Sequence, residues 1–314
     1  MPRASVGRWV VEDIDNIRAL LASKPRPASW AERRERISEV GSTWPVAEDI
    51  TCTPAEFGSV KGEWTSAPNS DATHVLLFFH GGGFCSGSVI SHRRLASEAG
   101  RAAGARCLAI EYRLAPEHPF PAALEDGLRA WLAVRRSGIE ARHIALAGDS
   151  AGGGLSVALA NELREAGEDS PGCLWLISPW TDLTLSGPTL VSKDAEDPLI
   201  HKPYLEELAS AYVAGRIERR DPRVSVLFAD LKTLPPILIQ VGSDETLLSD
   251  ATRFAEAAGA ANVAVTLEIW PRMIHAWPVW NGGLVEGREA IARAGQFIRR
   301  CLAPANSAGA SPPA

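Results

Sequence analysis

The chain has 314 residues, of which 46% are hydrophobic and 22% are charged, a balance typical of a globular protein and not of a disordered or membrane protein. Its 38 acidic and 32 basic residues are mixed along the sequence, and the net charge of -6 includes no basic block that would indicate a nucleic-acid partner. No segment approaches the roughly 18 apolar residues of a membrane span, and acidic residues interrupt the N-terminal apolar stretch where a secretory signal would be continuous, so we expect a cytoplasmic protein.

Two patterns precede the main part of the chain. Residues 1–45 have the spacing of amphipathic helices and contain several Trp. The runs ITCTPAEF and SVKGEWTSA follow, and PNSDA after them has the composition of a turn. This order predicts a hairpin that adds antiparallel strands to the edge of a sheet.

From residue 74 onward, short apolar runs rich in β-formers alternate with helical patterns. Six strands are predicted, at residues 74–79, 106–112, 143–148, 173–178, 236–242 and 263–270. Most are nearly continuous apolar runs, as expected for strands covered on both faces. The sequence therefore predicts an α/β fold with a mostly parallel central sheet flanked by helices.

The alternation is interrupted once, by residues 185–222, and a long insertion in a compact domain usually forms a lid or a functional segment. We expect this insertion and residues 1–45 to form a helical cap over the carboxyl edge of the sheet, although two unrelated surface segments would also fit. Residues 46–184 and 223–303 would then make the core, and residues 304–314, rich in Pro, Ala and Ser, are expected to be disordered.

A nucleophile is predicted where an apolar strand meets an apolar helix, at Gly148-Asp149-Ser150-Ala151-Gly152. This G-x-S-x-G sequence is typical of a sharp strand-to-helix turn that exposes the serine at its apex. Glycines are needed two residues either side, because side chains there would clash with the neighbouring strand and helix. Alone the motif is weak evidence, so the rest of the site must support it.

A glycine-rich segment, His80-Gly81-Gly82-Gly83-Phe84, follows the strand at residues 74–79. Glycines at a strand end let backbone N–H groups approach a ligand, which predicts an oxyanion hole made by Gly82 and Gly83 together with the amide of Ala151. A phosphate loop fits less well, because no G-K-[ST] follows.

When a G-x-S-x-G turn carries the nucleophile, the acid and then the base follow the serine along the chain. This order restricts the search to the C-terminal third. His275, just past the last predicted strand, is the expected base, with His201 in the insertion as the alternative. Asp244 is the expected acid and Glu245 is the runner-up. Asp250 is better explained as a carboxylate near the start of a helix.

The five cysteines lack CxxC spacing and are expected to be reduced, with Cys85 noted because it adjoins the glycine run. No set of His, Cys and carboxylates has the spacing of a metal site, so we expect no metal and no organic cofactor. Phe84, Trp180 and Trp277 are candidates to bind substrate in an apolar pocket, although large aromatics also serve as core.

Six segments resemble, in order and spacing, the bacterial relatives of hormone-sensitive lipase within the α/β-hydrolases: HGGGF, EYRLAPEHPFPAALED, GDSAGG, SPWTDL, VGSDETLLSDA and WPRMIHAW. The resemblance implies a carboxylesterase with a cap that acts on esters of short to medium acyl chains and pairs as a homodimer through its last strands. It also implies the Ser150, Asp244 and His275 triad. Gly154, Glu111 and Phe84 depart from the residues frequent in that family, and none of these changes removes a catalytic group.

Two other functions stay open from sequence. An amidase or deacetylase could use the same triad, because both reactions pass through a tetrahedral intermediate. A binding protein could keep the fold without activity, although a retained base at His275 argues against it. The expected partner in the main interpretation is a small ester.

Overall fold

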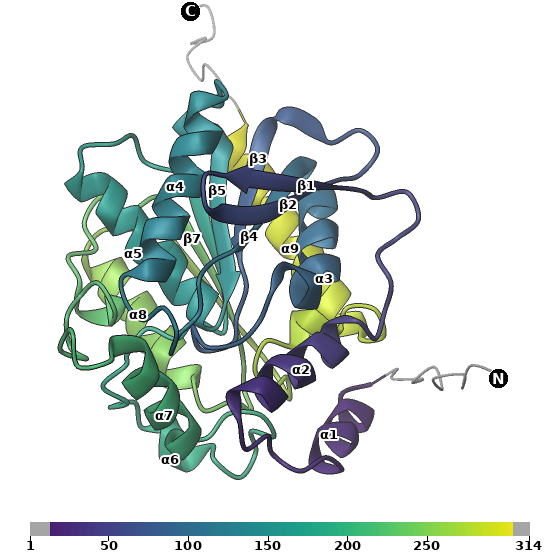
Figure 1. Ribbon diagram of the computed structural model, residues 1–314, viewed down its shortest axis with the longest axis vertical. Helices are drawn as coiled ribbons and strands as arrows, with labels where there is room; N and C mark the ends of the chain where they lie inside the picture. Colours follow the sequence, from purple (N-terminus) through teal and green to yellow (C-terminus); the bar gives the residue numbers. More distant parts are fainter. Residues whose placement is uncertain (1–12, 304–314) are drawn as a thin grey trace, which may run out of the picture.

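The computed structural model describes residues 13–303 and contains one eight-stranded sheet in the order β1-β2-β4-β3-β5-β6-β7-β8 (Figure 1). The strands are β1 (Thr51–Phe57), β2 (Val60–Ser66), β3 (Asp71–Phe79), β4 (Ala105–Glu111), β5 (Ile144–Asp149), β6 (Cys173–Ile177), β7 (Ile237–Gly242) and β8 (Val265–Trp270). β1 and β2 form the predicted hairpin, and β2 runs antiparallel to β4, whereas the other neighbours are parallel. The predicted α/β fold is confirmed.

Helices cover both faces of this sheet (Figure 1). They are α1 (Ile14–Ala22), α2 (Trp30–Gly41), α3 (Val89–Ala103), α4 (Ala122–Arg136), α5 (Ala151–Glu165), α6 (Thr189–Ser192), α7 (Lys202–Val213), α8 (Leu248–Ala260) and α9 (Val285–Leu302), with short 3-10 turns η1 (Ala141–His143), η2 (Val226–Phe228) and η3 (Trp277–Trp280). Within residues 13–303 no helix is both long and apolar enough to cross a membrane.

The side chains of β3 show how the layers form. Leu76 and Phe78 belong to a core shared with α3 and α9, whereas Leu77 and Phe79 belong to the core shared with α4, α5 and α8. Alternate residues of a strand point to opposite faces, so a continuous apolar run fills both cores. The cysteines of β4 and β6, Cys107 and Cys173, are buried here as free thiols.

Parallel pairing sets where the chain leaves each strand. Phe79 pairs with Gly148, and Asp149 pairs with Ile177 on the next strand. The segments after β3, β5, β6, β7 and β8 therefore meet at one edge of the sheet, the edge where open α/β sheets bind ligands.

Helices of the N-terminal segment and of the 185–222 insertion lie beyond that edge. α1, α2, α6 and α7 gather below the carboxyl ends of the strands (Figure 1). Arg33 of α2 pairs with Glu207 of α7 at 2.6 Å, and its guanidinium lies 5.0 Å from the ring centre of Tyr204. The N-terminal segment thus contacts the 185–222 insertion directly, whereas the predicted tail at residues 304–314 lies outside the described residues.

Candidate active site

Ser150 occupies a strained turn between β5 and α5, with φ 54° and ψ -121°. A positive φ on a residue with a side chain costs on the order of 1–3 kcal/mol and occurs mostly at functional sites. Gly148 and Gly152 make the turn sterically feasible, because a Cβ at Gly148 would meet the backbone of Gly152 and one at Gly152 would meet the carbonyl of Phe79. The backbone amide of Ser150 donates to the carbonyl of Ile177 at 2.8 Å, which fixes the turn to β6.

His275 lies in the loop after β8 and is 5% exposed. Its Nδ1 is 3.4 Å from Oε1 of Glu245, a carboxylate that is fully buried. The other carboxylate oxygen accepts hydrogen bonds from the Ser178 hydroxyl at 2.7 Å and from the Gly242 amide at 2.9 Å. Glu245 is therefore held in place from two sides while it faces the imidazole.

The pKa of His275 is raised above its ordinary value by this environment. Burial acts to lower the pKa of the imidazole, but the hydrogen bond and the charge of Glu245 raise it more, with further help from Asp197 and Asp149. A carboxylate that stabilises the protonated imidazole is the relation expected between the acid and the base of a hydrolytic triad.

Asp244, the acid expected from sequence, does not face His275, and this corrects that assignment. Its Oδ2 accepts a hydrogen bond from Arg18 of α1 at 2.7 Å, and its Oδ1 accepts one from the Ser243 hydroxyl at 2.8 Å. The side chain is 25% exposed, so Asp244 holds α1 at the surface of the site. The runner-up, Glu245, occupies the position beside the base.

The two other residues weighed from sequence have structural roles. His201 is the N-cap of α7, where its Nδ1 accepts from the amide of Tyr204 at 3.2 Å, although its side chain also lines the cavity described below. Asp250 lies in the first turn of α8, as expected, and accepts from the amide of Asp182 at 3.0 Å.

The glycine loop after β3 presents free amides near Ser150. Gly82 and Gly83 have φ of 114° and 63°, values that favour glycine, and a Cβ on Gly83 would strike the side chain of Leu208. Among residues 13–303, no protein acceptor takes the amide hydrogens of Gly82, Gly83 or Ala151. Free amides at this position fit the oxyanion hole expected from sequence.

Asp149, next to the nucleophile, fixes this loop. Its Oδ1 accepts from the amide of Gly81 at 2.9 Å, and its Oδ2 lies 3.3 Å from Nε2 of His92. His80 bonds the carbonyl of Gly81 through Nδ1 at 2.8 Å, and burial together with His92 lowers the pKa of His80 to about 3. A neutral His80 therefore donates to that carbonyl, and the loop is anchored on both sides of Gly81.

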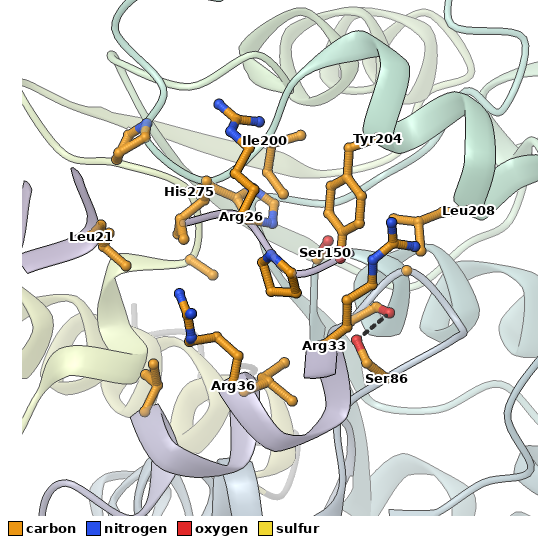
Figure 2. Close-up of a pocket in the computed structure, with 18 of the residues that line it drawn as sticks. Leu21, Arg26, Arg33, Arg36, Ser86, Ser150, Ile200, Tyr204, Leu208 and His275 are labelled. Atoms are coloured by element: carbon orange, nitrogen blue, oxygen red, sulfur yellow. Dashed lines mark hydrogen bonds between the residues drawn. The ribbon is translucent and has the colours of Figure 1, made fainter. Parts of the chain in front are cut away.

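The serine turn, the loop of His275 and the glycine loop border one cavity of about 430 Å³ (Figure 2). Ser150, His275, Gly82 and Gly83 lie on its wall together with Trp180. The apolar part of the wall comes mainly from the N-terminal helices and the insertion: Leu21, Ile37, Val40, Leu199, Ile200, Leu205 and Leu208. Sequence reasoning named none of these residues, although the amphipathic pattern of residues 1–45 marked an apolar face that needs a partner.

Two of the three aromatic residues expected to bind substrate lie outside this lining. Phe84 is 3% exposed and stacks on Tyr212 with ring centres 3.7 Å apart. Trp277 is fully buried in a cluster with Trp270 and Ile274. Phe84 and Trp277 are therefore core residues, which corrects those two assignments, whereas Trp180 is on the cavity wall. Cys85 is also core, and burial raises the pKa of its thiol to about 12.

The chain is similar to known hydrolases and esterases. Residues 76–279 match the family described as the alpha/beta hydrolase fold. An acetyl-hydrolase of Streptomyces hygroscopicus is 40% identical over 88% of this chain and 89% of its own length, and an esterase of Acinetobacter venetianus is 34% identical over 84% and 87%. The crystal structure of an esterase from the bacterial hormone-sensitive lipase family has a TM-score of 0.90 at 38% identity, covering 92% of this chain and 98% of that one. The chain belongs to the hormone-sensitive lipase family of the alpha/beta hydrolase fold and is a carboxylesterase.

Proposed function

We propose that Ser150, His275 and Glu245 are the catalytic triad of this carboxylesterase and that the amides of Gly82, Gly83 and Ala151 form its oxyanion hole. The observation that carries the proposal is that His275, paired with the buried Glu245, lies on the wall of the same cavity as the strained Ser150. A base oriented by a fixed carboxylate is what a neutral serine hydroxyl needs to become a nucleophile.

The chemistry follows from this arrangement. Nε2 of His275 takes the Ser150 proton as the hydroxyl oxygen attacks the ester carbonyl, and the negative oxygen that forms accepts hydrogen bonds from the free amides. The C–O bond to the alcohol then breaks, and the alcohol leaves with the proton from His275. Water repeats the sequence on the acyl-enzyme, which releases the acid and restores Ser150.

The proposed substrates are small esters with short to medium acyl chains. The supporting observations are the cavity volume of about 430 Å³ and its apolar lining, which includes Trp180, Leu205 and Leu208. Activity on a series of p-nitrophenyl esters from acetate to palmitate should peak below ten carbons. A peak at longer chains would indicate a lipase instead.

We further propose that residues 1–45 and 185–222 act together as a cap, supported by the contact between Arg33 and Glu207.

A homodimer paired through β8 is proposed because β8 is an edge strand and exposes 47% of Ile269. Sedimentation of the purified protein tests the dimer. The cytoplasmic location expected from the sequence stays a proposal.

Replacing Ser150 by Ala tests the triad. Hydrolysis of p-nitrophenyl butyrate and covalent labelling by a fluorophosphonate should both fall to background, whereas Ser137→Ala, which changes a serine at the C-cap of α4, should retain both. Undiminished turnover in Ser150→Ala would overturn the proposal. A protein that binds ligands without catalysis would not be labelled, and a comparison of matched esters and anilides separates an esterase from an amidase.

A further inference from the structure

The cavity wall carries an excess of positive charge. Four cationic side chains from the N-terminal segment line it, Lys24, Arg26, Arg33 and Arg36, and the acidic residues on the same wall are Asp149 and Glu207. The whole chain has a net charge of -6, so the positive lining is a local feature. Figure 2 shows Arg26, Arg33 and Arg36 around the same space as Ser150 and His275.

Both acidic residues of the wall are already paired. Glu207 binds Arg33 at 2.6 Å. Asp149 accepts from the Gly81 amide and faces His92, so its charge stabilises the glycine loop. Neither carboxylate therefore neutralises the cations nearer the mouth.

The cations at the mouth differ in how they are satisfied. Lys24 binds Glu39 at 3.0 Å, whereas Arg36 reaches the same carboxylate only at 3.9 Å and donates to the carbonyl of Pro25 at 3.2 Å. Arg26 is exposed and makes no ion pair or hydrogen bond with any residue between 13 and 303. One glutamate thus serves two cations, and a third cation has no partner there.

Arg33 adds an independent observation deeper in the wall. Its side chain is only 9% exposed, and its Nε and Nη1 have no hydrogen-bond acceptor among the described residues. The guanidinium is held between Trp30 and Tyr204, with ring centres at 4.5 and 5.0 Å, and by Glu207. A buried guanidinium with unused donors is costly unless an acceptor arrives with a ligand.

We propose that the preferred ester of this carboxylesterase carries an anionic group, a carboxylate or a phosphate, on the end away from the reacting carbonyl. Arg26 or Arg36 binds that group at the mouth, and Arg33 offers a second set of donors further in. The apolar wall of Leu21, Ile37 and neighbouring residues contacts the chain between the charge and the ester. Guanidinium groups suit both anions, and a cleft lined by one sign of charge concentrates ligands of the other sign. This inference rests on the proposed function of the same site.

Two matched pairs of esters test the proposal and distinguish the two anions. Mono-p-nitrophenyl adipate is compared with its neutral methyl ester, and acetylglycerol phosphate is compared with acetylglycerol. The quantity measured is the ratio of kcat/KM for the charged member over that for the neutral member. Wild type should prefer the charged member of at least one pair by about two- to fivefold, the range expected for a partly exposed ion pair.

Variants assign the preference to residues. The double variant Arg26→Gln with Arg36→Gln should bring the ratio close to one, and salt raised from about 0.05 to about 0.5 M should lower the wild-type ratio by screening. Arg142→Gln is the control, because Arg142 is 62% exposed and lies at η1, which precedes β5 at the opposite edge of the sheet. It should leave the ratio unchanged.

Butyrate hydrolysis and fluorophosphonate labelling are measured on every protein in parallel. If both fail in wild type, the proposed function fails. If both succeed while the ratio is near one for both pairs, the preference for an anionic ester is overturned and the esterase stands. If the ratio is high but survives in the double variant, the anion site at Arg26 and Arg36 is overturned.

Discussion

Glu245 and Asp244 are adjacent carboxylates after β7 that face different partners, and their variants should behave differently. Glu245→Gln removes the charge that stabilises protonated His275, so kcat/KM should fall by about 10²–10⁴, as expected when the acid of a triad is neutralised. Asp244→Asn should change kcat/KM by only a few fold, because its carboxylate binds Arg18. Steady-state hydrolysis of p-nitrophenyl butyrate measures both.

The pH profile distinguishes this role of Glu245 from a merely structural one. His275 must be neutral to act as a base, and Glu245 raises its pKa. Loss of that charge lowers the pKa, so the acid limb of the kcat/KM profile should move to lower pH in Glu245→Gln and stay in place in Asp244→Asn. A shift confined to Asp244→Asn would restore Asp244 as the acid.

The sequence was sufficient to find Ser150 and His275 as candidates because chemistry restricts them. A serine between two obligatory glycines at a strand-to-helix turn has few alternatives, and only His201 competed with His275 in the relevant third of the chain. The choice between Asp244 and Glu245 depended on side-chain direction at a strand end. The partners that decide it, Ser178 and Arg18, are 67 and 226 residues away in sequence, so no local signal could show them.

Helix α1 connects several loops around the site. Arg18 donates to Asp244, to the carbonyl of Glu196 in the insertion at 2.8 Å, and to the carbonyl of Arg272 at 2.8 Å. Ile17 is fully buried in the cluster that holds Trp277 and Ile274. One side chain therefore ties the loops after β7 and β8 to the insertion.

Arg18→Ala should loosen α1 while the core stays folded. We expect faster limited proteolysis within the N-terminal 45 residues and a decrease in the global free energy of unfolding of about 1 kcal/mol or less, because the pair with Asp244 is partly exposed. Lys193→Ala is the control, since Lys193 approaches the same carboxylate only at 3.9 Å. Equal protection of Arg18→Ala and wild type would show that the apolar contacts of α1 suffice.

Elements were easier to predict than their contacts. Apolar runs located six strands, from β3 to β8, because strands covered on both faces have a distinctive composition, and turn residues indicated the hairpin of β1 and β2. The amphipathic pattern in residues 1–45 indicated helices, and the length of the 185–222 insertion indicated a lid, but neither signal says what the segment packs against. The cavity wall made by Leu21, Ile37 and Leu208 therefore required the tertiary structure.

For the whole molecule, a buried acid cluster joins the chain after β6 to helix α8. Asp250 accepts from the backbone amides of Thr181 and Asp182 through Oδ2, and its Oδ1 has no partner among the described residues. Burial first, and then the charge of Asp182, raise the pKa of Asp250 to about 8. The folded protein thus holds a proton on Asp250 at neutral pH, which an unfolded chain would release above about pH 4.

The contribution of Asp250 to the free energy of unfolding should therefore decline as pH rises. A folded-state pKa above the unfolded value means that the folded state binds the proton more tightly, so this contribution is complete below about pH 4 and is lost as pH rises through about 8. Asp250→Asn keeps an oxygen for the two amides and cannot ionise. Its free energy of unfolding relative to wild type should increase between pH 5 and 9, by on the order of a few kcal/mol.

Urea denaturation at each pH measures that difference, and the comparison of two proteins cancels the other titrating groups that they share. Asp169→Asn, at a side chain that is 76% exposed, is the control for removing a carboxylate without burial. The informative quantity is how the difference in free energy of unfolding between Asp250→Asn and wild type changes with pH. Its size at any one pH also includes the packing cost of the amide, which is the same at every pH. A difference that stays flat from pH 5 to 9 would mean that Asp250 is already ionised in the folded protein, with Arg253 near Asp182 neutralising the cluster.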